Sequence, residues 1–207
     1  MSCILIGDII KSQTLENLPE VVARLKKTLG EINRNYRGEI LGPFVIFGGD
    51  SFEGALNSPL HAYDIYRRIS AALPPVRVRC VASVGRIADF AGGNVLEMTG
   101  PIFTRATDVL AEISKRRQRP RIHFHLASTK PERDATINIL AALVDAITRT
   151  WTGRTYALSA LSDSSIEEMS RRLGITRQAI LKQFTTRSIM EVRAAQDEIR
   201  RQLGKMA

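Results

Sequence analysis

The order of the predicted elements indicates an α+β fold, in which a βαββαβ domain is followed by an all-helical domain. Short apolar runs typical of strands alternate with amphipathic helices up to about residue 128, and no strand signal follows. The segment Ser128–Pro131 indicates a turn or linker. We therefore divide the 207-residue chain into residues 1–128, a connecting helix at 129–152, and a helical domain at 153–207.

The first half of the sheet is predicted from three strands and a helix. A nearly continuous apolar run at Cys3–Ile10 is typical of a strand buried on both faces. Apolar residues at helical spacing predict a helix over Leu15–Tyr36. Two further strands, Glu39–Phe47 and Ser51–Leu56, flank the turn Gly48–Asp50 and predict a hairpin.

The second half completes the sheet. Pro59–Leu73 is predicted to be a helix, and the alternating segment Val76–Ile87 a strand. The order βαββαβ is that of the ferredoxin-like unit, an antiparallel sheet with both helices on one face. After a glycine-rich loop at 91–94, a third helix at Pro101–Ser114 and a strand at Arg121–Leu126 are expected.

The C-terminal part has the pattern of a helix-turn-helix. The helix Thr136–Thr150 leads into it, with five residues expected on its inner side: Ile137, Leu140, Leu143, Val144 and Ile147. Ser165 and Glu168 then form a capping box, Gly174 marks a tight turn, and a second helix starts at Arg177. A final helix, Arg187–Leu203, is expected to pack on this unit or to form a dimer seam.

The helix-turn-helix pattern predicts binding to double-stranded DNA. Thr176, Arg177, Gln178 and Lys182 occupy the exposed N-terminal half of its second helix, with groups suited to base edges and phosphates. Residues 150–207 hold ten Lys and Arg against six Asp and Glu, which suits this partner. The alternative is a three-helix packing or dimerisation module.

Composition agrees with a phosphate-bearing partner in the cytoplasm. The net charge of +9 and the pI near 10.1 favour nucleic acids, nucleotides or an anionic surface. The two cysteines, Cys3 and Cys80, lie in predicted strands and suggest small core residues in a reducing compartment. We expect a cytoplasmic protein without signal peptide or membrane helix, since the first apolar run is short and interrupted by Asp8.

Two carboxylates are predicted to meet at one end of the sheet. The first and third strands of a βαββαβ sheet are neighbours, so Asp8 is expected close to Asp50. Such a pair favours Mg²⁺ or Mn²⁺, which would in turn hold a triphosphate. Backbone at Ile9, Lys11 and Ser12 would face the phosphates, and Gly48 and Gly49 would allow close approach. The alternative makes Asp8 a helix-start residue and Asp50 a turn former.

Five motifs carry a resemblance to known families. ILIGDIIKS, FVIFGGDSFEGAL, VRVRCVASVGRI, MTGPIFTRA and a late WT before the helix-turn-helix run in this order along nearly the whole chain. The chain resembles the SatD family in these motifs. IGDI and the GGD hairpin also resemble the class III nucleotide cyclase and GGDEF superfamily. That resemblance implies a palm-type ferredoxin-like domain, a nucleoside triphosphate, two metal ions and a homodimer.

The cyclase catalytic groups are replaced in this chain. Ser51 follows the hairpin aspartate where the GGDEF pattern has an acidic residue, and Ile46 replaces the base-selecting lysine. Thr104 and Asp108 stand where the resemblance implies an asparagine and an arginine, which leaves Arg105 as the candidate catalytic group for the phosphates. We expect Glu53, a possible third acidic group, to be solvated, and His123 and His125 to be surface or half-buried residues.

These observations predict a nucleotide-sensing, DNA-binding regulatory protein. The alternative is a metal-dependent cyclase or nucleotidyltransferase that makes a cyclic nucleotide or a nucleotide polymer. A third possibility is a palm used only as a dimerisation scaffold.

Overall fold

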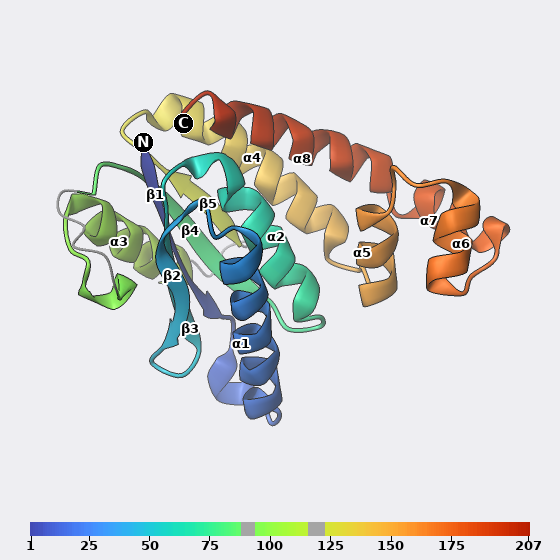
Figure 1. Ribbon diagram of the computed structural model, residues 1–207, viewed down its shortest axis with the longest axis horizontal. Helices are drawn as coiled ribbons and strands as arrows, with labels where there is room; N and C mark the ends of the chain where they lie inside the picture. The colour runs from blue at the N-terminus through green and yellow to red at the C-terminus, as the bar shows by residue number, and fades with distance from the viewer. Residues whose placement is uncertain (88–93, 116–122) are drawn as a thin grey trace.

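The fold is mixed α+β, with a five-stranded sheet and eight α-helices in the part that the structure describes. The computed structural model describes residues 1–87, 94–115 and 123–207. Figure 1 shows the sheet at one end and a helical extension at the other. Among the described residues, no helix combines the length and the apolar content needed to cross a bilayer. The predicted 91–94 loop and the start of the Arg121–Leu126 strand include residues outside these ranges.

The sheet has the order β2-β3-β1-β4-β5, in which all neighbours are antiparallel except the parallel pair β4 and β5. The strand β1 (Ser2–Ile9) lies between β3 (Ser51–Leu56) and β4 (Val78–Gly85). The edges are β2 (Ile40–Phe47) and β5 (Phe124–Ala127). The predicted adjacency of the first and third strands is confirmed, since Asp8 is the register partner of Ser51.

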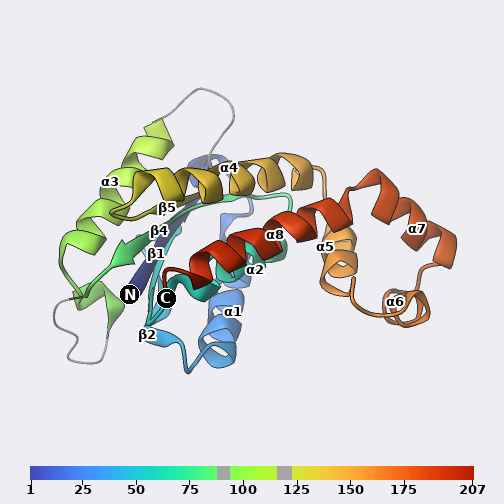
Figure 2. The ribbon, with the colours of Figure 1, turned by 90° about the horizontal axis from the view of Figure 1, so that it is seen from above.

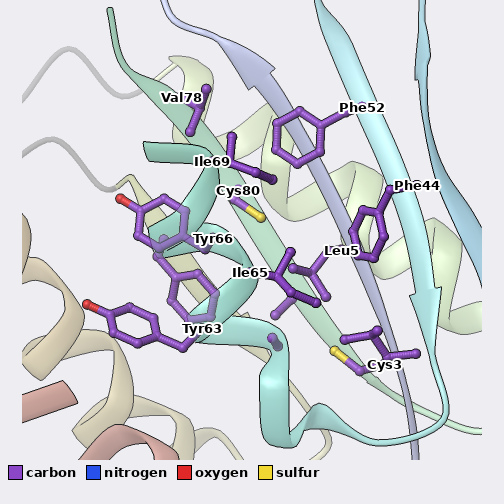
Figure 3. Close-up of a cluster of buried hydrophobic side chains, with 14 of the residues drawn as sticks. Cys3, Leu5, Phe44, Phe52, Tyr63, Ile65, Tyr66, Ile69, Val78 and Cys80 are labelled. Carbon is purple, nitrogen blue, oxygen red and sulfur yellow. The ribbon is translucent and has the colours of Figure 1, made fainter. Parts of the chain in front are cut away.

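Helices cover both faces of the sheet. On one face, α1 (Leu18–Asn35) and α2 (Ala62–Ala72) bury the main core, where Leu5, Phe52 and Cys80 meet Ile65 and Ile69 of α2 (Figure 3). These positions alternate along the strands because successive side chains point to opposite faces. On the other face, Ile6 and Val81 pack with Ala106 and Ile113 of α3 (Pro101–Lys115).

The helical part begins with α4 (Pro131–Thr148), which packs against β5 and α8. It continues with α5 (Gly153–Ala160), α6 (Ile166–Leu173), α7 (Arg177–Thr186) and α8 (Ile189–Gly204). Figure 2 shows α6 and α7 projecting beyond the sheet while α8 runs back beside α4. Met169, Ile180, Ile189 and Val192 form a second core with Trp151.

The last helix joins both cores. Its N-terminal half places Ile189 and Val192 in the helical core, whereas Ile199 and Leu203 of its C-terminal half lie in the main core beneath the sheet. The predicted packing of this helix on the helical pair is therefore confirmed for one half only. The division at residues 128 and 152 stays a prediction, and side chains of α8 pack in the cores on both sides of it.

Candidate functional site

The turn Gly48–Asp50 closes the β2–β3 hairpin next to the end of β1. Gly48 and Gly49 have φ angles of 59° and 91°, the left-handed region that glycine adopts without strain. A Cβ at either position would meet no atom within 4 Å, so the turn, rather than a close neighbour, requires glycine. The Asp50 carbonyl accepts a hydrogen bond from the Ile9 N–H at 3.1 Å, which ties the turn to β1.

The side chains of Asp8 and Asp50 have different partners. Arg79 of β4 holds both oxygens of Asp8, with Nε to Oδ1 at 2.8 Å and Nη2 to Oδ2 at 3.0 Å. This pairing follows from the register, in which Arg79 lies opposite Asp8. Asp50 instead accepts hydrogen bonds from the hydroxyls of Ser12 and Ser51. The predicted approach of the two segments is correct, but each carboxylate is already bound within the chain.

This arrangement does not fit a divalent cation shared by Asp8 and Asp50. A metal at Asp8 would have to displace a bidentate guanidinium, the strongest common geometry for binding a carboxylate. The residues that the structure describes contain no group of three or more His, Cys, Asp or Glu side chains placed to hold a metal. Metal binding by Asp8 and Asp50 remains a prediction that requires the Arg79 pair to open.

The predicted phosphate-binding residues already make hydrogen bonds within the chain. The N–H of Ile9 is used by Asp50, and the next N–H, of Ile10, donates to the Arg77 carbonyl at 2.8 Å. Lys11 is exposed and has a φ of 61°, and its carbonyl accepts from Thr14. Ser12 is buried and bound to Asp50.

Arg105 lies far from the two carboxylates. It donates from Nη1 to the Val84 carbonyl at 3.1 Å, and Val84 pairs with Cys3 at the other end of β1. Asp8 lies five residue steps along the strand from Cys3, which is about 17 Å. Within one chain, Arg105 therefore does not join Asp8 and Asp50 on a common phosphate.

Glu53 is buried rather than solvated, contrary to expectation. It is 9% exposed, and its register partners are the apolar residues Ile6 and Val45. Burial raises the pKa of Glu53 to about 7. The alternation of side chains along β3 does predict that Glu53 points inward, since Ser51, Glu53 and Ala55 share the face that α3 covers.

The raised pKa of Glu53 predicts a pH-dependent stability. The folded state binds the Glu53 proton more tightly than the unfolded state does. The stabilisation that comes from this proton is therefore complete below the unfolded pKa near 4.5, and it is lost as the pH rises through about 7. We expect Glu53→Gln to raise the melting temperature relative to wild type at pH 8 and not at pH 4.5. Glu16→Gln, at an exposed position, is the control, and a pH-independent difference for Glu53→Gln would contradict the prediction.

The helices α6 and α7 form a compact pair. Ser165 caps α6 by accepting from the Glu168 N–H at 3.1 Å, as the capping box predicts, and Gly174 ends it with a φ of 62°. Thr176 caps α7 by accepting from the Ala179 N–H at 3.2 Å. Gln183, a polar residue on the inner side of α7, is explained by its hydrogen bond from the Thr155 hydroxyl at 3.2 Å.

The predicted DNA-binding residues are exposed in the first half of α7 and at its cap. Thr176, Arg177, Gln178 and Lys182 are all exposed, while Ile180 of the same segment is fully buried. Arg177 lies 3.5 Å from Glu167 of α6, and both side chains are largely exposed. Figure 2 shows α6 and α7, the helices that carry these residues, at the end of the molecule away from the sheet.

A pocket that the sequence did not indicate lies between the sheet and the helical part. Its volume is about 520 Å³, and its wall includes Tyr66, Arg67, His123 and Asp145. These residues come from α2, from the segment before β5 and from α4, so no local motif marks them. The one available signal was Asp145, a carboxylate within an otherwise apolar stretch of α4.

Comparison with known families gives one match. The family model described as SatD family matches residues 3–195, which is most of the chain. Comparison with curated proteins found no match.

Proposed function

The chain belongs to the SatD family, and from that premise we propose that it is a cytoplasmic DNA-binding regulator whose sheet domain senses a nucleotide. The observation that carries the proposal is the pair α6 and α7, with four hydrogen-bonding side chains exposed on the first half of α7. We take this pair as a helix-turn-helix, in which the second helix enters the major groove with its N-terminal residues at the bases.

The packing of the pair supports this assignment. Met169 of α6 and Ile180 of α7 are buried against Ile189 and Val192 of α8. This core holds α7 in place, so α7 does not need a partner on its exposed side in order to fold. Arg177 and Lys182 supply positive charge, while Thr176 and Gln178 supply hydrogen bonds suited to base edges. In a protein with net charge +9, this surface is the best match to DNA.

Fluorescence anisotropy with double-stranded DNA tests the DNA-binding proposal, first on random duplexes and then on sequences selected from them. We expect Arg177→Ala with Lys182→Ala to weaken binding about tenfold or more and to lower the slope of log K against log salt by about 1.8, or 0.9 for each phosphate contact. Arg201→Ala, at an exposed arginine of α8, should change neither. Unchanged affinity in the double variant would contradict the proposal.

We assign the sheet to the ferredoxin-like palm type because β1 lies between β3 and β4 with antiparallel neighbours, as that fold requires. This order supports the cyclase resemblance and the nucleotide as ligand class. The enzyme alternative receives no comparable support: Asp8 is bound to Arg79, and Arg105 lies at the other end of β1. We therefore propose sensing rather than turnover.

The proposed regulator is a homodimer formed through α4. Ile139, Leu143 and Ile147 of α4 are 61%, 55% and 40% exposed, and they follow one another at a spacing of four residues. Ala135 and Ala146 are also exposed there, so α4 carries apolar residues on its outer side as well as its inner side. A helix that is apolar all round is normally buried on every side.

Charges at the two ends of this stripe indicate a second copy of the chain as the partner. Glu132 lies at the N-terminal end of α4 and Arg149 directly after its C-terminal end, and both are exposed. If two α4 helices pack antiparallel around a two-fold axis near residue 141, Glu132 of each copy lies opposite Arg149 of the other. The apolar residues between them then face each other, and Ala135 and Ala146 allow close approach of the helices.

A further inference from the structure

The pocket between the sheet and the helical part has the size of a ligand site. Its volume of about 520 Å³ falls within the range typical of small-molecule sites. The C-terminal end of α2 and the turn Pro74–Val78 form one side, and the residues that join α4 to α5 form the other. It lies at the end of the sheet where β1 finishes, since Ile9 pairs with Val78.

Buried polar atoms in this pocket lack hydrogen-bond partners. Asp145 is 4% exposed; its Oδ1 accepts from the Tyr66 hydroxyl at 2.7 Å, but its Oδ2 has no hydrogen bond within the described chain. His123, 8% exposed, has an unbonded Nδ1 that lies 3.6 Å from that same Oδ2, too far for a hydrogen bond. Arg67 also has an unbonded Nε. Because buried polar groups are normally paired, such a cluster in one pocket points to a ligand.

The charge of the pocket favours an anion. Arg67, Arg77 and Arg149 line it, against the single carboxylate of Asp145. Arg67 donates to the Thr148 hydroxyl at 3.3 Å and lies 3.8 Å from Asp145 Oδ1, so its charge is only partly matched. Arg77 donates one N–H to the Arg149 carbonyl at 2.6 Å, which orients its guanidinium at the pocket wall. Guanidinium groups bind phosphate through two parallel hydrogen bonds.

We propose that this pocket binds a small phosphate ester that also carries an N–H or O–H donor. Arg67 and Arg77 hold the phosphate, and the donor group reaches Asp145 Oδ2. A mononucleotide has both features, because its base carries N–H groups. The regulatory role of this site rests on the proposed function, whereas ligand binding by the pocket does not depend on DNA binding.

The pocket wall is bonded directly to the proposed DNA-binding unit. The indole N–H of Trp151, which lines the pocket, donates to the carbonyl of Arg187 at 3.1 Å, directly after α7. Arg187 in turn donates from Nη1 to the Thr150 hydroxyl at 3.0 Å. A ligand that orders residues 148–153 therefore fixes the end of α7 relative to the sheet.

The test is a titration of the full-length protein, without DNA, with the four ribonucleoside monophosphates and inorganic phosphate. Calorimetry measures affinity, and the fluorescence of Trp151, the one tryptophan in the chain, reports on the pocket. We expect at least one ester to bind and Arg77→Gln to weaken it at least tenfold. Arg68→Gln should stay within twofold of wild type, because Arg68 follows Arg67 on α2 but bonds Tyr36 outside this pocket.

Asp145→Asn tests the proposed contact between Asp145 and the hydrogen-bond donor of the ligand. The amide keeps the shape of the side chain but removes the negative charge that attracts this donor. It should reduce the preference for the ester over inorganic phosphate about tenfold. Equal affinity in wild type and Arg77→Gln, or no binding of any ester to protein shown to be folded by circular dichroism, would overturn the site. Ester binding that follows these rules, in a protein that does not bind DNA, would support the site and contradict the proposed function alone.

Discussion

Leu203→Ala is expected to lower the free energy of unfolding by about 3 kcal/mol, the middle of the range for deleting a fully buried leucine side chain. Leu203 is 0% exposed and lies in the main core with Ile199 and Met206, although it belongs to the last helix. The loss combines the removed apolar contact with the cavity that remains between α8 and α4. Urea unfolding at constant m-value measures it.

Leu181→Ala is the matched control for this experiment. Leu181 is also a helical leucine of the C-terminal part, but it is 46% exposed on α7. Its truncation should change the free energy of unfolding by no more than about 0.5 kcal/mol. Similar losses in both variants would mean that α8 does not contribute to the core of the sheet, contrary to the packing described above.

Leu143→Glu is expected to convert the proposed dimer into a monomer, raising its dissociation constant at least 100-fold. In the antiparallel arrangement, Leu143 lies near the two-fold axis, so each dimer would bury two unpaired carboxylates close together. The side chain is 55% exposed in the single chain, and the monomer should therefore stay folded. Sedimentation velocity measures the change, and Met190→Glu, at a 54% exposed position of α8, should leave the dimer intact.

Charge reversal tests the direction of the helices in this dimer. Glu132→Arg and Arg149→Glu should each weaken association because like charges then face each other at both ends of the stripe. The double variant restores opposite charges and should recover most of the affinity. A monomeric wild-type protein at high concentration, or a double variant weaker than either single variant, would contradict the antiparallel pairing.

Local patterns predicted the sheet well. The strand Ser51–Leu56 has the predicted bounds, and the hairpin turn lies at Gly48–Asp50, because the glycines and the apolar alternation act over a few residues. The helix α4 starts five residues before the predicted Thr136, because the segment Ser128–Pro131 has the composition of a linker. Ser128 instead donates its N–H and its hydroxyl to Asp134, so this turn is the beginning of the helix.

Contacts between distant segments could not be predicted in the same way. Leu143 and Ile147 were expected on the inner side of α4, but the helix is apolar nearly all round, so periodicity does not select the buried side. The proximity of Asp8 and Asp50 followed from topology, whereas the partner of Asp8 depended on the register of β4, which places Arg79 opposite it. The pocket around Asp145 depends on the packing of α4 against α2, which no short sequence motif predicts.

The position of α8 also has a consequence for synthesis of the chain. Because Ile199 and Leu203 complete the core beneath the sheet, the apolar surfaces that they cover on the earlier elements stay open until the ribosome has added these residues. An N-terminal domain normally folds as a unit while later residues are still being made, but the surfaces of α2 and α4 that α8 covers stay exposed at that stage. We therefore expect a chain that stops before residue 199 to leave this apolar surface exposed, because Ile199 and Leu203 would be missing from the main core.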